Sequence, residues 1–437
     1  MISIDTLSEW ERLKSISFSF NQKKVIEMLS KTRIRILMAW LMLCSLPILA
    51  CGSDLTLKIY GNANLDDTID QRDVDYIEGI INGTQENNEL ADANNDGSIG
   101  QEDIAQIEDI VAGREKNLIL KDTANRTVSI DMPVERVIVP SGLTAEAFKV
   151  LKATDKIVGV SNAIHEKTYF FPEFADLPSV GGWKIEDYEA AISLDPDLVI
   201  SYEKWPPISE AEEKLDPAGI PVVVLEFTDP NFVTEELVKL SYILGTNGAE
   251  DRYIQWRSGY ERQIDEYVND LSRDERPSVF LETGFKGLND VGTYGEGAKG
   301  SLVLELTGGR NIAANMSEAY PHVDSEWIIT ENPEVLMKYV YSSELDWGWN
   351  STDEPEALIE EISSRDGWES IDAVKNQRVY LISNELMTGL DSVVGYLYWV
   401  KLLHPEFAAD PTEAYKEYIT DFLGMEFPDL VFVFPKP

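Results

Sequence analysis

Two stretches of the sequence, thirty residues apart, repeat one pattern of oxygen-bearing side chains. The stretch DANNDGSIGQED at 92–103 places them at positions 1, 3, 5, 7 and 12 of a twelve-residue loop, with Gly97 at position 6. The stretch NANLDDTIDQRD at 62–73 uses the same offsets, but it starts with Asn62 and carries Asp67 in place of the glycine. Oxygens at these offsets surround a hard cation such as Ca²⁺, which takes about six to eight oxygen ligands. Because the pattern occurs twice, we interpret it as a built unit rather than an accidental acidic turn.

We therefore predict that each loop binds one calcium ion. In the first loop the predicted ligands, with Asp70 acting through water, are Asn62, Asn64, Asp66, the Thr68 carbonyl, Asp70 and Asp73. In the second loop they are Asp92, Asn94, Asp96, the Ser98 carbonyl and Asp103. Apolar residues at helical spacing follow each loop, and Gly83 and Gly113 stand where the two helices are expected to end. The prediction for 54–116 is a small all-α domain with two calcium loop-helix repeats.

Loop-helix repeats whose calcium loop ends in Asp rather than Glu resemble a dockerin, an adhesive module that binds a cohesin domain on another protein. The resemblance implies that loop positions 10 and 11 contact the partner, which here are Gln71, Arg72, Gln101 and Glu102. The competing interpretation is that calcium only staples a small domain that lacks a core of its own. The two interpretations do not exclude each other.

The amino-terminal segment KTRIRILMAWLMLCSLPILAC at 31–51 has a basic start, an apolar core and a small residue before Cys51. Its end, ILAC, resembles a lipobox, which implies lipidation of Cys51 and anchoring to the outer face of a membrane. Leu49 is unusual for a lipobox, so a plain signal peptide or an uncleaved anchor stays open. The start codon, Met1 or Met28, also stays open. The segment 1–51 is thus interpreted as an extension and export signal of an extracytoplasmic protein.

From Leu118 onward, short β-rich runs alternate with segments of helical period, which is typical of α/β layering. The clearest runs are RVIVP, IVGV, DLVISY, PVVVLEF, SVFLET and RVYLIS. A long helical stretch, broken only around Gly245, separates the first four runs from the others. We predict an α/β fold of two Rossmann-like lobes, 118–229 and 273–437, joined by a linker helix at 230–272. A ligand cleft is expected between the lobes, because open α/β sheets bind ligands beyond the carboxyl ends of their strands.

The segments RVIVPSGLTAEAF, LPSVGGW, YEAAISLDPDLVIS, LTGGRNIA and WESIDAVKNQRVYLIS occur in this order along the chain. Together they resemble helical-linker substrate-binding proteins of ABC importers, the group that serves iron chelates, haem and cobalamin. The resemblance covers nearly all of 118–437. It implies a binding protein, not an enzyme, that captures a small-molecule metal chelate outside the cell and delivers it to a permease with a cytoplasmic ATPase.

Aromatic residues follow several predicted strands, and flat rings stack on macrocycles, chelate rings and cations. The predicted ligand-binding residues are Trp183, Tyr202, Trp205, Tyr294, His322 and Trp347. The family resemblance implies that the loop of Trp183 turns into the cleft. Lys184, Lys204 and Lys286 are further hydrogen-bond donors for a carboxylate or phosphate of the ligand. Packing in a lobe core is the competing interpretation, above all for Tyr202 and for Trp349.

The same resemblance implies one surface glutamate on each lobe that pairs with arginines of the permease. Glu189, in EAAISLDPD, falls at that position in the first lobe. In the second lobe Leu302 occupies the matching position, and Glu305, one helical turn away, is the substitute. The competing interpretation of both glutamates is an ordinary exposed charge on a helix.

Composition and missing motifs exclude other classes of function. The net charge of −41 argues against nucleic-acid binding, which needs a clustered basic surface. The chain has no P-loop, G-x-S-x-G, H-E-x-x-H or C-x-x-C, and its three histidines are far apart in the sequence, which argues against an enzyme and against capture of bare zinc. The order of expected ligands is ferric chelate, cobalamin, haem and oxyanion. The alternative function is a cell-surface scaffold or glycan-binding protein assembled through dockerin-cohesin pairing.

Overall fold

The computed structural model describes residues 57–202, 206–283, 291–340 and 347–437. Contacts group Thr56–Pro437 into one compact unit, which is the part treated below. Four predicted functional positions, Cys51, Lys204, Trp205 and Lys286, lie outside the described residues. No helix within the described residues is both long enough and apolar enough to span a membrane.

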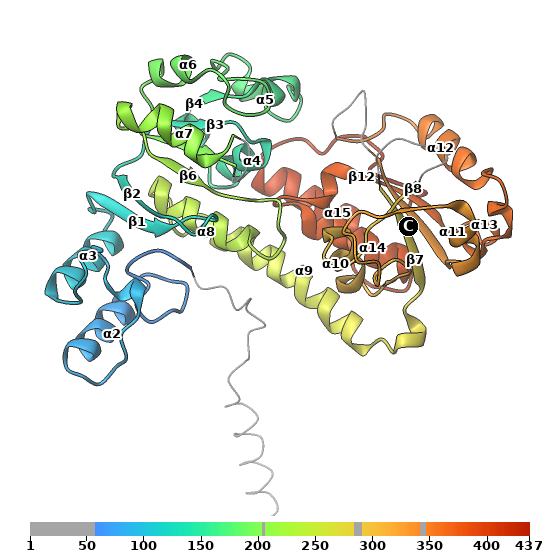
Figure 1. Ribbon diagram of the computed structural model, residues 1–437, viewed down its shortest axis with the longest axis horizontal. Helices are drawn as coiled ribbons and strands as arrows, with labels where there is room; N and C mark the ends of the chain where they lie inside the picture. Colours follow the sequence, from blue (N-terminus) through green and yellow to red (C-terminus); the bar gives the residue numbers. More distant parts are fainter. Residues whose placement is uncertain (1–56, 203–205, 284–290, 341–346) are drawn as a thin grey trace, which may run out of the picture. The chain divides into compact units, whose positions relative to one another are not determined.

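The first part of the described chain contains two short helices, each starting directly after one of the repeated loops (Figure 1). These helices are α2 Gln71–Ile81 and α3 Gln101–Val111. Asp70 caps α2 by accepting a hydrogen bond from the Arg72 N–H at 2.7 Å. The helices pack through fully buried isoleucines, Ile77 and Ile107, at the periodicity that predicted them.

A two-stranded antiparallel hairpin, β1 Asn117–Lys121 and β2 Thr127–Asp131, follows α3. It is tied to the preceding segment, because Ile59 forms an isolated antiparallel bridge with Leu120 and the Tyr60 N–H donates to the Ile119 carbonyl at 2.9 Å. Buried residues of this region belong to the same hydrophobic cluster as the first lobe. The small helical region therefore shares a core with the rest of the described chain.

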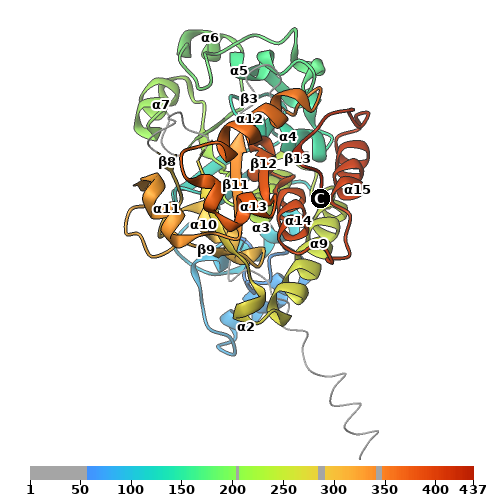
Figure 2. The same ribbon diagram turned by 90° about the vertical axis from the view of Figure 1, so that its right-hand side faces the viewer.

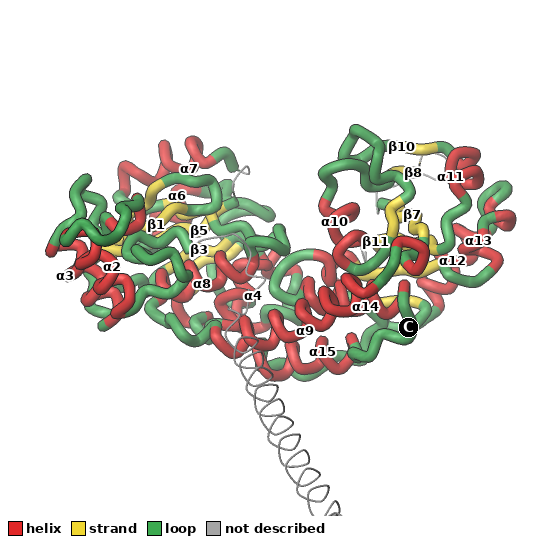
Figure 3. The backbone as a smooth tube through the Cα atoms, turned by 90° about the horizontal axis from the view of Figure 1, so that it is seen from below, coloured by secondary structure: helices red, strands yellow, loops and turns green. Residues whose placement is uncertain are grey.

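The first lobe is built on a parallel four-stranded sheet in the order β4-β3-β5-β6. Its strands are β3 Val137–Val139, β4 Ile157–Val160, β5 Leu198–Ser201 and β6 Val222–Val224. Its helices are α4 Gly142–Val150, α5 Asn162–Glu166, α6 Tyr188–Ser193 and α7 Ile208–Leu215. Ile138 packs with residues of α6 and α7, whereas Val137 and Val139 pack in the cluster that contains residues of α4. Figure 3 shows α6 and α7 on one side of these strands and α4 on the other. Burial on both faces explains why the strands are continuous apolar runs in the sequence.

The linker consists of two helices, α8 Val233–Leu244 and α9 Asp251–Asp270. α8 ends at Gly245, which adopts the left-handed conformation with φ of 64°. The break therefore falls where the sequence predicted it. α9 then packs along α14 Ser392–Leu403 of the second lobe (Figure 1).

The second lobe has a five-stranded sheet in the order β13-β12-β11-β7-β9, parallel except at β13. The strands are β7 Ser278–Glu282, β9 Arg310–Asn311, β11 Val335–Val340, β12 Val379–Ser383 and β13 Val433–Phe434, and a separate pair is β8 Val291–Gly292 with β10 His322–Val323. The remaining helices are α10 Lys299–Leu306, α11 Ser325–Glu331, α12 Asp353–Ser363, α13 Asp372–Lys375 and α15 Pro411–Glu417. α12 and α13 contact β12 and β11, and the opposite face packs on α10 and α14 (Figure 2). The predicted architecture of two α/β lobes with parallel sheets is confirmed.

Candidate ligand-binding pocket

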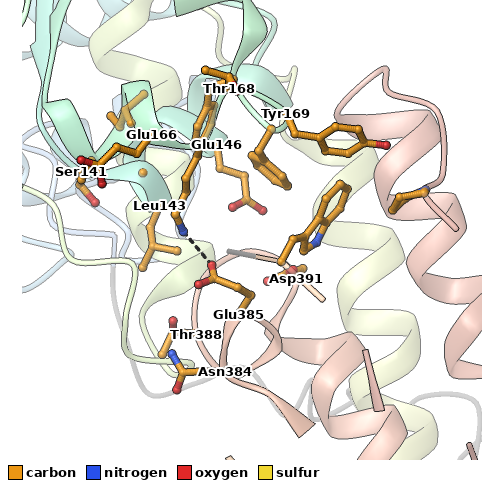
Figure 4. Close-up of a pocket in the computed structure, with 18 of the residues that line it drawn as sticks. Ser141, Leu143, Glu146, Glu166, Thr168, Tyr169, Asn384, Glu385, Thr388 and Asp391 are labelled. Atoms are coloured by element: carbon orange, nitrogen blue, oxygen red, sulfur yellow. Dashed lines mark hydrogen bonds and ion pairs between the residues drawn. The ribbon is translucent and has the colours of Figure 1, made fainter. Parts of the chain in front are cut away.

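A cavity of about 730 Å³ is lined by loops of both lobes. This volume lies in the usual range for small-molecule sites. The first lobe contributes the start of α4, the segment from Ala163 to Phe171 and Tyr202; the second contributes Trp347, Asn350, the segment around Glu385 and Asp391, and residues 428–430. Figure 4 shows these side chains around the cavity.

The lining segments begin where parallel strands end. Ser141 follows β3, Tyr202 follows β5 directly, and Asn384 with Glu385 follows β12. Carboxyl ends of parallel strands are the edge at which α/β sheets bind ligands, because the connecting loops are free to carry polar groups there. The pocket thus lies at the edge where the strand pattern of the sequence placed the ligand loops.

One wall of the pocket is aromatic. The ring of Trp347 lies 5.5 Å from the ring of Tyr169 and 5.0 Å, edge-on, from the ring of Phe170, measured between centroids. The Trp347 indole N–H donates a hydrogen bond to the buried Tyr415 hydroxyl, which fixes its orientation. Lys149 donates to the Phe170 carbonyl at 2.7 Å and thereby holds the segment that carries this wall.

The lining of the pocket is also acidic. Among the described lining residues, the charged ones are Glu146, Glu166, Glu385, Asp391, Asp429 and Lys167. Lys167 of the first lobe pairs with Glu385 of the second at 2.9 Å, the interaction drawn as a dashed line in Figure 4. The Tyr418 hydroxyl donates to the Glu146 carboxyl group.

Burial changes the ionisation of two of these carboxyl groups. Glu146 and Asp391 are each only 5% exposed. Desolvation raises the pKa of Glu146 to about 7, and the negative charge of Glu385 acts in the same direction, while the Tyr418 hydrogen bond opposes it. Desolvation, followed by the charges of Glu146 and Glu385, also raises the pKa of Asp391 well above its usual range. Both groups therefore keep their protons to a higher pH than ordinary carboxyl groups do.

The structure brings two of the predicted ligand residues, Tyr202 and Trp347, into the pocket. Trp183 is 48% exposed and contacts Tyr202 with a centroid distance of 5.7 Å, and the Tyr202 hydroxyl donates to the Trp183 carbonyl at 3.3 Å. The Lys184 ammonium lies 5.8 Å from the centre of the Trp183 ring. Trp183 thus adjoins a lining residue without lining the cavity itself.

The remaining predicted aromatic residues lie elsewhere in the second lobe. Tyr294 packs against Tyr320 and Tyr339, with centroid distances of 5.8 and 5.7 Å, and His322 is an exposed residue of β10. Neither lines the cavity. Trp349, for which core packing competed with ligand contact, is 3% exposed and belongs to a core cluster.

Sequence reasoning missed most of the polar residues of the pocket. Glu146 left one signal in the sequence, because it stands between Ala145 and Ala147 in a largely uncharged helical segment, GLTAEAFKV. Tyr169 and Phe170 belong to a non-helical segment after α5, so no periodicity marked them. Both predicted docking glutamates, Glu189 and Glu305, are exposed on helices, on α6 and α10.

The two predicted calcium loops have matching backbone conformations. At position 4, Leu65 and Asn95 have φ of 63° and 55°, and at position 6, Asp67 and Gly97 have φ of 65° and 92°. Asp67 therefore adopts the left-handed conformation for which glycine is usual. Its carboxylate also accepts the N–H of Leu57 at 2.5 Å.

The last carboxylate of each loop closes it in the same way. Asp73 accepts the N–H groups of Asn64 and Asp70 at 3.0 and 2.8 Å. Asp103 makes the corresponding bonds, with the N–H groups of Asn94 and Gly100, at 3.1 and 2.7 Å. Both carboxylates are fully buried.

Several features bear on whether these loops fit a cation. The Asn62 Oδ1 atom, at position 1, is buried and has no hydrogen-bond partner. Burial raises the pKa of Asp73 to about 6 and also raises the pKa of Asp103, so a nearby cation would relieve both groups. Arg72 forms ion pairs with Asp66 and Asp70 of the first loop. In the described ranges, no three His, Cys, Asp or Glu side chains are gathered closely enough to form a metal site by themselves.

Comparison with known proteins identifies relatives of the two-lobe part. The profile of a family described as "Periplasmic binding protein" matches residues 137–386. YvrC of Bacillus subtilis, an uncharacterized ABC transporter substrate-binding lipoprotein, is 28% identical over 272 residues, which make up 61% of this chain and 78% of that protein. The molybdate-binding protein MolA of Haemophilus influenzae is 23% identical over 286 residues, or 60% of this chain and 76% of MolA.

A solved structure has a similar fold. The TroA-like periplasmic binding protein FepB from Veillonella parvula superimposes with a TM-score of 0.64 at 21% identity, covering 72% of this chain and 98% of that one. The similarity extends to both lobes, since such a share of this chain exceeds what either lobe contains. The two-lobe architecture is therefore that of TroA-like binding proteins.

Proposed function

The chain belongs to the periplasmic binding protein family, and from that premise we propose that it is the extracytoplasmic receptor of an ABC importer. Its relatives are binding proteins rather than enzymes. The observation that carries the proposal is the pocket of about 730 Å³ formed by strand-end loops of both lobes. A site shared by two lobes closes around a small molecule, because contacts with both lobes stabilise the liganded arrangement.

The proposed ligand is a metal chelate of the siderophore type, a corrinoid or haem. The aromatic wall of Tyr169, Phe170 and Trp347 supports a flat or ring-bearing ligand, since such rings stack well. The polar groups of the lining would fix the orientation of the ligand. MolA, a relative, binds molybdate, so an oxyanion is the fourth ligand class for the test.

Tryptophan fluorescence tests the proposal, because Trp347 lines the pocket. The protein would be titrated with a ferric siderophore, cobalamin, haem and molybdate. We expect saturable quenching by one of them with a Kd of about 1 μM or lower. Trp347→Phe should remove most of the signal, whereas Trp327→Phe on α11, away from the pocket, should retain it. No quenching by any of the four from folded protein would contradict the receptor function.

Delivery to a permease is proposed to use Glu189 and Glu305. Their exposure on helices of different lobes supports this, since a permease that grips both lobes needs a charged contact on each. Lipidation of Cys51 would anchor the receptor to the outer face of the cell membrane, near that permease.

We further propose that the loop-helix repeats bind two calcium ions and attach the protein to a cohesin domain. The matching loop backbones and the unpartnered Asn62 oxygen support the calcium part. Calcium would supply the positive charge that the buried Asp73 and Asp103 lack. Isothermal titration with calcium checks it: binding near two ions per chain is expected, and an absence of heat would contradict it.

A scaffold that has lost transport is the competing proposal. The second docking position favours it, because Leu302 stands where the family has glutamate. The fluorescence titration separates the two, since a scaffold has no need of a chelate.

A further inference from the structure

The charges that line the pocket are strongly unbalanced. Five carboxyl groups face one lysine among the described lining residues, and these include no arginine or histidine. The lysine, Lys167, is already paired with Glu385 at 2.9 Å. Neither Glu166 nor Asp429 forms an ion pair within the described part of the chain. The described lining of the pocket therefore has a surplus of acidic groups.

This surplus does not depend on the buried carboxyl groups. Even with protons on Glu146 and Asp391, the exposed side chains of Glu166 and Asp429 remain as acidic groups without an ion-pair partner in the described lining, and the charges of Lys167 and Glu385 cancel each other. An anionic ligand would therefore meet the exposed Glu166 and Asp429 as well as the buried carboxyl groups of Glu146 and Asp391. Each unpaired charge brought next to a like charge lowers affinity.

The aromatic wall adds to the same preference. Aromatic ring faces such as those of Trp347 and Tyr169 carry negative partial charge and attract cations, and the Lys149 ammonium already lies 5.4 Å from the centre of the Phe170 ring. Figure 4 shows Glu146 and Glu385 projecting toward the cavity from α4 and from the turn after β12, beside this wall. A bound cation would be flanked by ring faces and carboxylates together.

We propose that the ligand of this pocket is net-cationic, a metal chelate or corrinoid that carries its positive charge into the carboxylate side of the cavity. The proposal rests on the receptor function above and narrows its ligand class. It disfavours trianionic catecholate chelates, haem with its two propionates, and molybdate.

Two pairs of probes differ in charge but little in shape. Ferrioxamine B carries a free ammonium group, and ferrioxamine E is a neutral ring with the same hydroxamate ligands. Aquocobalamin is a cation at pH 6.5, and cyanocobalamin is neutral. Ferric enterobactin and molybdate are the anionic probes. Affinities of the full chain would be measured by isothermal titration at low and at high salt.

We expect the cation of one pair to bind on the order of tenfold more tightly than its neutral counterpart, and the ratio to shrink at high salt. Glu385→Gln leaves Lys167 as an unpaired cation, so it should reduce the ratio severalfold. Glu213→Gln removes an equal charge on exposed α7, away from the pocket, and should leave the ratio unchanged. A smaller ratio in both variants would show a general effect of net charge and overturn the local explanation.

Other outcomes separate this inference from the receptor function. Equal affinities within the pair that binds, or tightest binding of an anion, would overturn the cationic ligand and keep the receptor. No binding of any probe to folded protein would contradict the receptor function and the inference with it.

Discussion

Glu146 offers a direct test of the buried acidic pocket through the pH dependence of stability. Its carboxyl has an ordinary pKa of 4.5 in the unfolded chain and about 7 in the folded protein, because burial disfavours the charged form. Between these two values the folded state binds more protons than the unfolded state. Stability contributed by this group is therefore complete below about pH 4.5 and is lost as the pH rises through about 7.

The variant Glu146→Gln keeps an acceptor for the Tyr418 hydroxyl but cannot ionise. The pKa difference corresponds to about 3 kcal/mol once both states are ionised. We expect the variant to be more stable than the wild type at pH 8 by up to this amount, and the gap to narrow by about 2 to 3 kcal/mol at pH 5. The variant also removes the negative charge of Glu146, which is one cause of the raised pKa of Asp391. This second effect adds to the stabilisation at high pH.

Urea unfolding followed by circular dichroism at pH 5, 6, 7 and 8 measures this gap. Glu213→Gln, on the exposed surface of α7, is the control and should follow the wild type at every pH. A gap that does not change with pH would refute the raised pKa. A variant that is less stable at every pH would instead assign Glu146 a hydrogen-bonding role through Tyr418.

Three further predictions concern other parts of the chain. Lys239→Met should destabilise the protein by about 3 to 5 kcal/mol in urea unfolding, because it leaves the buried Glu236 and the half-buried Glu235, now 3.0 and 2.8 Å from the ammonium, without a cation; a loss under 1 kcal/mol would contradict this. Glu189→Arg should preserve ligand affinity and lower uptake in cells that carry the importer, and normal uptake would remove Glu189 from the docking surface. Calcium at about one hundred times its Kd should raise stability by about 3 kcal/mol, and Asp103→Asn should reduce that gain; an unchanged melting temperature in chelator would count against calcium binding.

Local patterns of the sequence predicted the elements well. The apolar runs of β3, β5, β7 and β12 became strands, because residues buried on both sheet faces leave no polar alternation. The two loop-helix units were also predictable, because the loop offsets and the helical spacing are both short-range patterns of the sequence. Gly245 indicated the break in the linker helix, because glycine readily adopts the left-handed conformation that ends α8.

The pocket was less predictable, because its residues meet only through tertiary structure. Lys167 and Glu385 are 218 residues apart and nothing in either segment points to the other. Trp183 is a loop residue after a Gly-Gly pair, yet it packs beside Tyr202 at the edge of the cavity. Two of the aromatic residues expected after strands, Tyr202 and Trp347, line the cavity, but the segment of Tyr169 and Phe170 follows a short helix and was not predicted.

The region of the two loop-helix repeats, where we propose calcium binding, is coupled to the first lobe through its backbone. The Ile69 N–H, inside the first loop, donates to the Tyr242 hydroxyl of α8 at 3.1 Å. The hairpin that follows α3 is bonded in turn to β6, through the Thr123 N–H and the Val224 carbonyl at 3.0 Å. A module on a flexible linker would unfold alone in chelator. These bonds join the first loop to the linker helix and to the sheet that carries the pocket loops, so loss of calcium should also weaken the first lobe, and hydrogen exchange of β6 should quicken in chelator.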